Sequence, residues 1–170
     1  MYIENVTELN EKYVFVGGEV VELIKSKERV QKYGEVFTPQ WVVEKMCDEL
    51  PDEAWKPETT FLEPSCGEGI FILEILRRKF ENCKTRKDYR TALKSVYGFE
   101  IQADNVKITI ENVINLCKKY FKISQSDIEI INDHIIMCDG LKIMRMLNEE
   151  QEQTETNKAK TEETHKAETV

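Results

Sequence analysis

The sequence predicts an α/β fold: a parallel sheet of about three strands flanked by helices, with an N-terminal helical extension. Strand-length apolar runs alternate along the chain with segments whose apolar residues recur at helical spacing, a pattern typical of parallel sheets with right-handed crossovers. In addition, the loop Gly67-Glu68-Gly69 separates the first apolar run from a helix-like segment. Loops at strand ends are where such folds bind small molecules.

The bulk composition indicates one ordinary domain. The chain has 170 residues, of which 41% are hydrophobic and 33% charged. No apolar run approaches the roughly 20 residues that span a bilayer, and the first residues show neither a basic nor an apolar leader segment. These features predict a cytoplasmic protein without membrane contact.

Cysteine usage and charge exclude two further classes. The five cysteines are scattered with no CxxC pair, which favours buried small side chains over a metal site. The net charge of −8 argues against a freestanding nucleic-acid binder. Half of that excess lies within residues 148–170, which hold seven Glu and three Lys, so the rest of the chain is only mildly acidic.

The N-terminal part is predicted to be helical. Residues 1–33 are interpreted as an N-terminal helical segment, because residues 19–24 repeat apolar side chains at helical spacing and a charged run follows up to Gly34. The main domain is assigned to residues 34–147. There Thr38 can cap a helix whose first residue is Pro39, and residues 40–50 then form one apolar face.

The remaining elements follow in order. The periodicity predicts strands and helices alternately, over residues 59–62, 70–80, 95–99, 103–120 and within 128–138. The basic residues 77–79 and 84–90 are interpreted as solvated faces. Residues 148–170 are predicted to be an acidic disordered tail, with a solvated helix as the alternative, since they hold almost no apolar side chain larger than alanine.

The strongest candidate site is the loop over residues 63–69, Glu-Pro-Ser-Cys-Gly-Glu-Gly. Its glycines permit a tight turn and close approach of a ligand, and the helix that follows directs its amides toward that ligand. Alone it also fits a plain strand-to-helix turn. Glu100 and Asp139 end the second and third predicted strands, where carboxylates can accept from a ribose diol and an adenine amino group.

Four segments, in this order, resemble the motifs of class I S-adenosylmethionine-dependent N6-adenine DNA methyltransferases of the restriction–modification type. Residues 34–39, Gly-Glu-Val-Phe-Thr-Pro, are similar to motif X, and residues 63–71 to motif I. Residues 98–101 resemble motif II and residues 138–141 resemble motif III. The resemblance spans roughly residues 31–147 and implies a partial Rossmann-like methyltransferase fold.

The resemblance implies S-adenosylmethionine as cofactor. The methionine part would face Glu63 and the glycine backbone and would be closed by Phe37 and Thr38; Glu100 would hold the ribose. Ile101 would pack on the adenine and Asp139 would bind its amino group. The complete set of expected cofactor-binding residues is Phe37, Thr38, Pro39, Glu63, Pro64, Ser65, Cys66, Gly67, Gly69, Glu100, Ile101 and Asp139.

One family motif is missing. The catalytic motif IV is Asp/Asn-Pro-Pro-Tyr/Phe, and none of the four prolines follows Asp139, so no catalytic residue is assigned. The resemblance therefore predicts the cofactor-binding half of an adenine methyltransferase that is inactive alone and reaches DNA through a complete enzyme. Because the family's first strand is central, residues 59–62 are expected to be an apolar sheet edge that a partner chain completes.

Two alternatives stay open. The chain could be a non-catalytic cofactor-binding protein that regulates or decoys a methylation system, or a truncated relic. Three further residues are given structural interpretations: His134 is expected to be structural or at the surface, and Trp41 and Trp55 to be packing residues.

Overall fold

The computed structural model of the chain describes residues 13–16 and 19–151, and it begins with a short antiparallel pair of strands. These are β1 (Tyr13–Val16) and β2 (Glu19–Glu22), followed by the helix α1 (Lys27–Tyr33). The prediction of one helix across residues 19–33 is therefore wrong for its first half. Adjacent β-branched valines favour a strand there, and the helix begins only after Ser26, whose hydroxyl accepts from the Arg29 amide. Residues 1–12 of the expected helical segment lie outside the described residues.

The second helix, α2 (Gln40–Asp48), starts one residue later than predicted. Pro39 keeps an extended ψ of 145° and occupies the cap position, so Thr38 does not cap the helix. Val43 and Cys47 are buried, whereas Met46 stays exposed, so the expected apolar face of this helix is only partly covered. A short 3-10 helix, η1 (Asp52–Trp55), then leads to the sheet.

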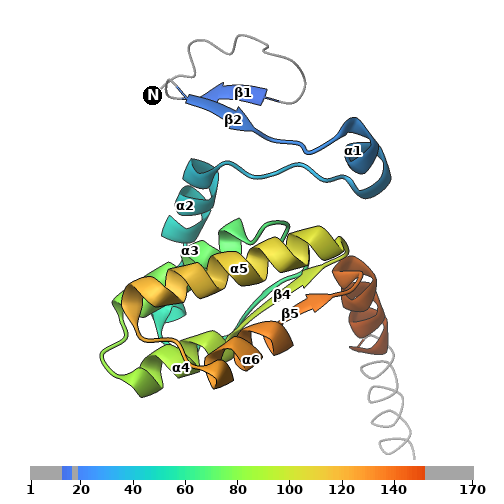
Figure 1. The fold of residues 1–170 in the computed structure, drawn as a ribbon. Helices are drawn as coiled ribbons and strands as arrows, with labels where there is room; N and C mark the ends of the chain where they lie inside the picture. Colours follow the sequence, from blue (N-terminus) through green and yellow to red (C-terminus); the bar gives the residue numbers. More distant parts are fainter. Residues whose placement is uncertain (1–12, 17–18, 152–170) are drawn as a thin grey trace, which may run out of the picture.

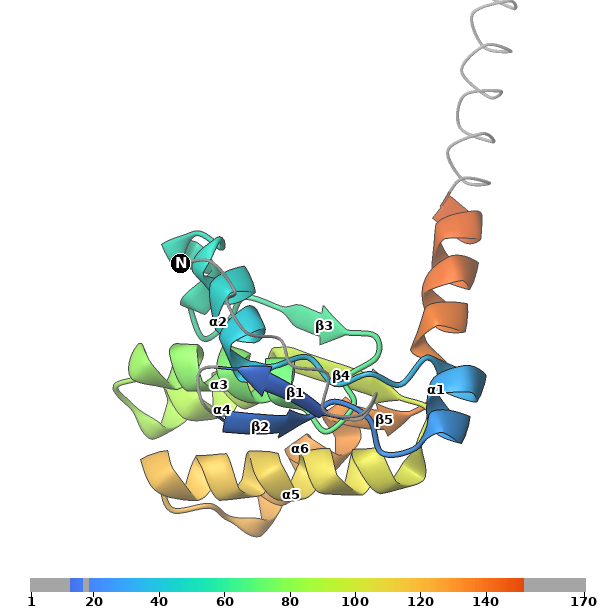
Figure 2. The same cartoon turned by 90° about the horizontal axis from the view of Figure 1, so that it is seen from above.

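The central sheet has three parallel strands in the order β3-β4-β5, as predicted. They are β3 (Phe61–Glu63), β4 (Val96–Glu100) and β5 (Ile135–Met137). The register places Glu63 beside Gly98 and Glu100 beside Met137. Figure 2 shows all three strands pointing toward the side of the molecule where α1 lies.

The two crossover helices agree with the periodicity of the sequence. They are α3 (Ile70–Glu81) and α5 (Ala103–Tyr120), and α5 lies across β4 and β5 in Figure 1. The core forms between these helices and the sheet, with α2 packed against α3. Its most deeply buried apolar side chains are Val43, Ile72, Leu76, Phe80, Val113 and Cys117.

Two helices between residues 84 and 138 were not predicted from the sequence. One is α4 (Arg86–Lys94), where the Thr85 and Asp88 side chains form a capping box in a segment interpreted as a solvated face. The other is α6 (Gln125–His134), which replaces most of the apolar run expected to be a strand. Ser124 and Asp127 form its capping box, and Asp127 also pairs with Arg86 of α4. Only the last three apolar residues of the run, in β5, are left for the sheet.

A further helix covers residues 140–151. The expectation of a disordered tail is therefore wrong for residues 148–151, and residues 152–170 lie outside the described residues. The Asp139 carboxylate accepts from the Lys142 amide at 2.9 Å, which satisfies one of the free donors at the start of this helix. Among the residues that the structure describes, no helix is long and apolar enough to cross a membrane.

The interpretation of residues 77–79 as a solvated face is wrong for Lys79. Its side chain is fully buried, and its ammonium donates to the carbonyls of Lys56, Pro57 and Thr59 and to the Ser95 hydroxyl. Burial lowers the pKa of Lys79 to about 8. This lysine ties the connector between η1 and β3 to α3.

The aromatic and histidine expectations have mixed outcomes. Trp55 is buried and its ring stacks on Phe61, which confirms a packing role. The His134 ring lies 3.0 Å from the Leu93 carbonyl and packs on Tyr97, so this histidine is structural. Trp41 was wrongly expected to pack: it lies at the surface, with the Lys45 ammonium 5.4 Å from its ring.

Candidate functional site

Three acidic residues gather at one edge of the sheet. Glu63 and Glu100 are the last residues of β3 and β4, and Asp139 lies two residues beyond the end of β5. Because the strands are parallel and in register, their carboxyl ends meet at the same edge. The sequence placed these residues on one rim, and the structure has them there.

The loop between β3 and α3 is held in a tight turn. Gly67 and Gly69 have φ angles of 55° and 87°, in the left-handed region that favours glycine. The Cys66 amide donates to the Phe99 carbonyl at 2.9 Å, and the Ser65 amide donates to the Glu63 carboxylate at 3.1 Å. These bonds fasten the loop to its own strand and to β4.

Helix α5 supports the same loop from the other side. The Thr109 hydroxyl donates to the Gly67 carbonyl at 2.9 Å. A Cβ atom on Gly69 would lie 2.6 Å from the Thr109 methyl carbon, so the loop and the helix approach as closely as glycine permits. The amides at the start of α3 are therefore held in a fixed position.

Glu100 is buried beneath this loop. One of its carboxylate oxygens accepts from the Gly67 amide and the other from the Gln102 amide, each at 2.8 Å. A carboxylate oxygen can accept more than one hydrogen bond, so both retain capacity for a ligand hydroxyl. Glu100 thus joins the loop after β3 to the turn after β4.

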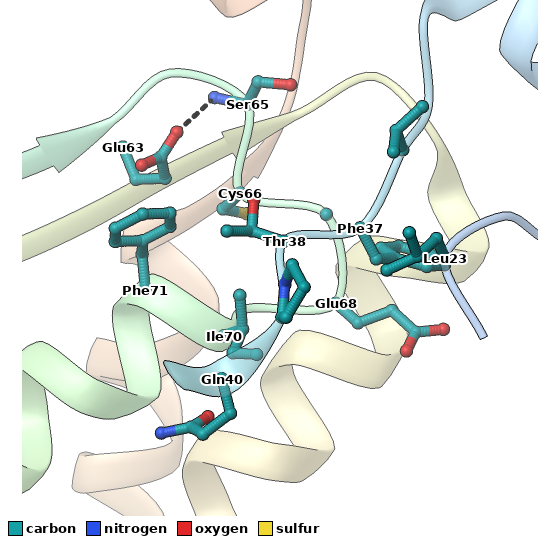
Figure 3. A pocket seen from close by; sticks show the side chains of 13 residues that line it. Leu23, Phe37, Thr38, Gln40, Glu63, Ser65, Cys66, Glu68, Ile70 and Phe71 are labelled. Carbon is teal, nitrogen blue, oxygen red and sulfur yellow. Dashed lines mark hydrogen bonds between the residues drawn. The ribbon is translucent and has the colours of Figure 1, made fainter. Parts of the chain in front are cut away.

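The first cavity, of about 450 Å³, lies between this loop and the segment that precedes α2. Figure 3 shows the Glu63 side chain with the Phe71 ring beside it on one side and Phe37 on the other, with Cys66 and Thr38 between them. The expected site residues among its lining are Phe37, Thr38, Pro39, Glu63, Ser65, Cys66 and Gly67. The cavity therefore unites residues resembling motif X with residues resembling motif I.

A second cavity, of about 200 Å³, lies at the ends of β4 and β5. Its lining includes the expected residues Pro64, Ser65, Ile101 and Asp139, and it shares Ser65 with the first cavity. The Ile101 side chain is 46% exposed. The remaining expected residues, Gly69 and Glu100, support the loop and line neither of these two cavities.

A polar network near the first cavity was not predicted. The Lys25 ammonium contacts Asn105 at 2.5 Å, Glu68 at 2.8 Å and Asp104 at 3.2 Å, and lies 5.7 Å from the Phe37 ring centroid. It thereby joins the glycine loop, α5 and the segment before α2. Glu68, Asp104 and Asn105 lie about 40 to 80 positions from Lys25 in the sequence, so no local pattern could reveal them.

The same network anchors α1. Arg29 donates to Asp104 at 2.7 Å and to the buried Glu35 carboxylate at 2.6 Å, and Asn105 also donates to Glu35 at 2.6 Å. These partners raise the pKa of Arg29 and lower the pKa of Asp104. Helix α1 is therefore held against the start of α5 by charge-assisted hydrogen bonds.

The cysteines are structural. Of the five, only Cys138 is partly accessible, and burial raises the pKa of Cys66 to about 12 although it lines the first cavity. A thiol with such a pKa stays protonated near neutral pH and is a poor nucleophile. Within the described part of the chain, no three His, Cys, Asp or Glu side chains lie close enough together to hold a metal ion.

Comparisons with known proteins show which proteins this chain is similar to. Residues 18–146 match the family described as N-6 DNA Methylase. The chain is 27% identical over 127 residues to "Type II methyltransferase M.VspI" of Vibrio sp. (strain 343), a match that covers 75% of this chain and 27% of that protein. It is 28% identical over 117 residues to "Modification methylase CviBIII" of Paramecium bursaria Chlorella virus NC1A, covering 69% of this chain and 25% of that protein. No solved structure matches the chain.

A parallel sheet with a glycine loop after its first strand and acidic residues at the next strand ends defines an open α/β domain, a class whose ligand sites lie at the carboxyl ends of the strands. The match over residues 18–146 makes the assignment specific: the chain belongs to the N-6 DNA methylase family. Its fold is a partial methyltransferase fold, with a three-stranded parallel sheet among many helices. The chain spans about a quarter of the length of the two curated relatives named above.

Proposed function

We propose that this chain binds S-adenosylmethionine as the cofactor-binding portion of a DNA adenine-N6 methyltransferase of the restriction–modification type. The observation that carries the proposal is the pair of adjoining cavities along one rim of the sheet, which share Ser65 and are lined by Glu63 and Asp139, with Glu100 beneath the loop between them. Together their size lies within the range of roughly 300–1,000 Å³ that is usual for small-ligand sites. Both curated relatives are named as methylating enzymes.

The residues present fit the chemistry of this cofactor. Its methionine part is cationic, and the first cavity offers the Glu63 carboxylate beside apolar walls. A Cβ on Gly67 would lie 3.6 Å from the Phe37 ring, so a larger residue there would fill the space between the loop and this ring. In the second cavity, Ile101 would face the adenine and Asp139 would accept from its amino group. Glu100, below the loop, would accept from the ribose hydroxyls.

Glu63 should make cofactor binding dependent on pH. Burial raises the pKa of Glu63, so its carboxylate takes up a proton at a higher pH than an ordinary glutamate does. A protonated Glu63 cannot pair with the cofactor's cationic group, and we expect the affinity to fall as the pH drops through this raised pKa. Calorimetric titrations between pH 5 and 7.5 measure the effect. Glu63→Gln should bind more weakly than wild type at pH 7.5 and show a flatter pH profile; identical profiles would exclude Glu63 from this role.

When bound, the cofactor would supply an activated methyl group. The residues of this chain would bind and orient it, but the sequence holds no Asp/Asn-Pro-Pro-Tyr/Phe segment to grip a target adenine. We therefore propose that methyl transfer needs further polypeptide, and that this chain contacts DNA only within such a complete enzyme. The chain would act in the cytoplasm.

The uncovered side of the sheet supports a need for further polypeptide. Leu62 of β3 and Ile136 of β5 lie on the same face of the sheet and are each 40% exposed. Within the described residues β3 pairs only with β4, which leaves its outer edge open. Open apolar edges and faces are normally covered. We propose a partner chain that adds strands beside β3 and helices over this face.

Binding and transfer can be tested separately. Isothermal titration of the 170-residue chain with S-adenosylmethionine should show binding, and absence of binding would contradict the proposed function. With tritiated cofactor and DNA, this chain alone should transfer no methyl group to adenine. Transfer should appear when a polypeptide carrying Asn-Pro-Pro-Tyr and the rest of the fold is added. Incorporation by the chain alone would disprove the need for a partner.

Gel filtration tests the open edge. We expect the chain alone to self-associate or to show fast amide hydrogen exchange in β3, because its edge amides have no partner within the described sheet. A stable monomer with a strongly protected β3 would count against the partner chain.

A further inference from the structure

Helix α1 contributes to the second cavity, although neither the motifs nor the strand ends include it. Lys32 and Tyr33, in the last turn of α1, line this cavity together with Ile101, Asp139 and Leu141. In both cartoon views α1 lies on the side of the molecule toward which β4 and β5 point (Figures 1 and 2). The cavity thus has one wall from the sheet ends and another from the N-terminal segment.

The position of this second wall is held by specific contacts. Arg29 of α1 bonds Asp104 and Glu35, and Asn105 bonds Glu35, so both ends of the segment around α1 are fastened to the start of α5. Gly34 follows with a φ of 67°, which ends the helix directly after Tyr33. Because Ile101 lies two residues before the start of α5, anchoring α1 to α5 fixes Tyr33 relative to Ile101.

Three exposed side chains with large apolar parts, Tyr33, Ile101 and Leu141, line this cavity. The exposed fractions of Tyr33, Ile101 and Leu141 are 41%, 46% and 56%. The Lys32 ammonium lies 5.0 Å from the Tyr33 ring centroid. The nearby side chains of Lys32 and Gln102 lower the pKa of Tyr33. An aromatic ring offers a flat, apolar wall to a ligand.

We infer that Tyr33 covers the adenine ring of the bound cofactor on the side opposite Ile101, so that α1 completes the adenosine half of the site. The inference rests on the proposed function, because it takes S-adenosylmethionine as the ligand. A purine has two apolar faces and binds most tightly when both are covered, and aromatic side chains stack on such faces. Ile101 covers one face, and Tyr33 is the aromatic side chain among the lining residues of this cavity.

The experiment compares Tyr33→Leu, Tyr33→Phe and the control Trp41→Leu in the 170-residue chain. Trp41 resembles Tyr33 in its surroundings, since it is 42% exposed and has a lysine ammonium 5.4 Å from its ring centroid. It lines neither of the two cavities, so its replacement controls for the loss of an exposed aromatic ring outside the site. Titration with S-adenosylmethionine should show a loss of affinity of roughly tenfold for Tyr33→Leu. Tyr33→Phe should stay within about twofold of wild type, because it keeps the ring, and Trp41→Leu should bind as wild type does.

Two further measurements separate contact from structure. 5′-Methylthioadenosine, which carries the adenosine without the amino acid, should lose affinity for Tyr33→Leu by the same factor. The bound adenine protons H2 and H8 should show an upfield ring-current shift in wild type and Tyr33→Phe that Tyr33→Leu lacks. If wild type binds S-adenosylmethionine and Tyr33→Leu binds it equally well, this inference fails and the proposed function stands. If wild type does not bind the cofactor, the proposed function fails and the inference with it.

Discussion

Replacing Glu100 with alanine is expected to weaken S-adenosylmethionine binding by at least about a hundredfold and to lower the free energy of unfolding by about 2–4 kcal/mol. The carboxylate accepts from the Gly67 and Gln102 amides, so its removal leaves two backbone donors without their acceptor. The same carboxylate is the proposed acceptor for the ribose hydroxyls. Calorimetric titration measures the affinity, and denaturant-induced unfolding measures the stability.

Two variants sharpen this test. Glu129→Ala removes an exposed glutamate of α6 and should change stability by no more than about 0.5 kcal/mol, with no change in affinity. Glu100→Gln keeps the shape of the side chain but turns one acceptor into a donor that faces a backbone N–H, so its effects should be intermediate. If Glu100→Ala kept wild-type affinity, Glu100 would have no part in the cofactor site.

Replacing Gly140 with alanine should destabilise the fold by about 2–3 kcal/mol and weaken cofactor binding. A Cβ atom at this position would lie 2.2 Å from the Pro64 carbonyl oxygen and 2.9 Å from the Phe99 Cβ. Since the first of these is backbone, the clash can be relieved only if the turn after β5 moves away from the loop after β3. That movement would displace Asp139 and widen the second cavity. Thermal unfolding and calorimetry measure the two effects.

Gly34→Ala is the matched control for this clash. Gly34 has a φ of 67°, but nothing lies within 4 Å of a Cβ built there. Its replacement should therefore cost only the backbone strain of a left-handed alanine, about 1–2 kcal/mol, and should leave the second cavity at its wild-type size. An equal loss of stability and an equal loss of affinity in both variants would show that steric contact at Gly140 is not the cause.

The bounds of long helices with a regular apolar repeat could be predicted closely from the sequence. The helix expected over residues 103–120 has the bounds of α5, and α3 ends one residue later than expected. Short elements could not be predicted in this way, because four to seven residues fit both a strand and a helix. Residues 19–22 and residues 128–134 were therefore assigned to the wrong class. The capping box at Ser124 and Asp127 was the local signal that would have identified α6.

The burial of charged side chains could not be predicted from the sequence either. Residues 77–79 look like an exposed basic face in the sequence, yet Lys79 is buried among carbonyl oxygens that lie about 20 positions earlier. Likewise, Lys25, Arg29 and Asp104 form one network only because the N-terminal segment folds back on α5. Whether a charged side chain is buried or exposed depends on its partners in the fold, and those partners are not its neighbours in the sequence.

By itself the sequence determined the class of fold, the family and the rim of the sheet where the acidic residues lie, because alternation, a glycine loop and residues at strand ends are local patterns. The tertiary structure alone decided which residues share a cavity. It divided the rim into two adjoining cavities, placed Glu100 beneath the loop as a support, and brought Tyr33 of α1 to the same cavity as Ile101. Such placement depends on packing and ion pairs between segments far apart in the chain, which periodicity does not encode.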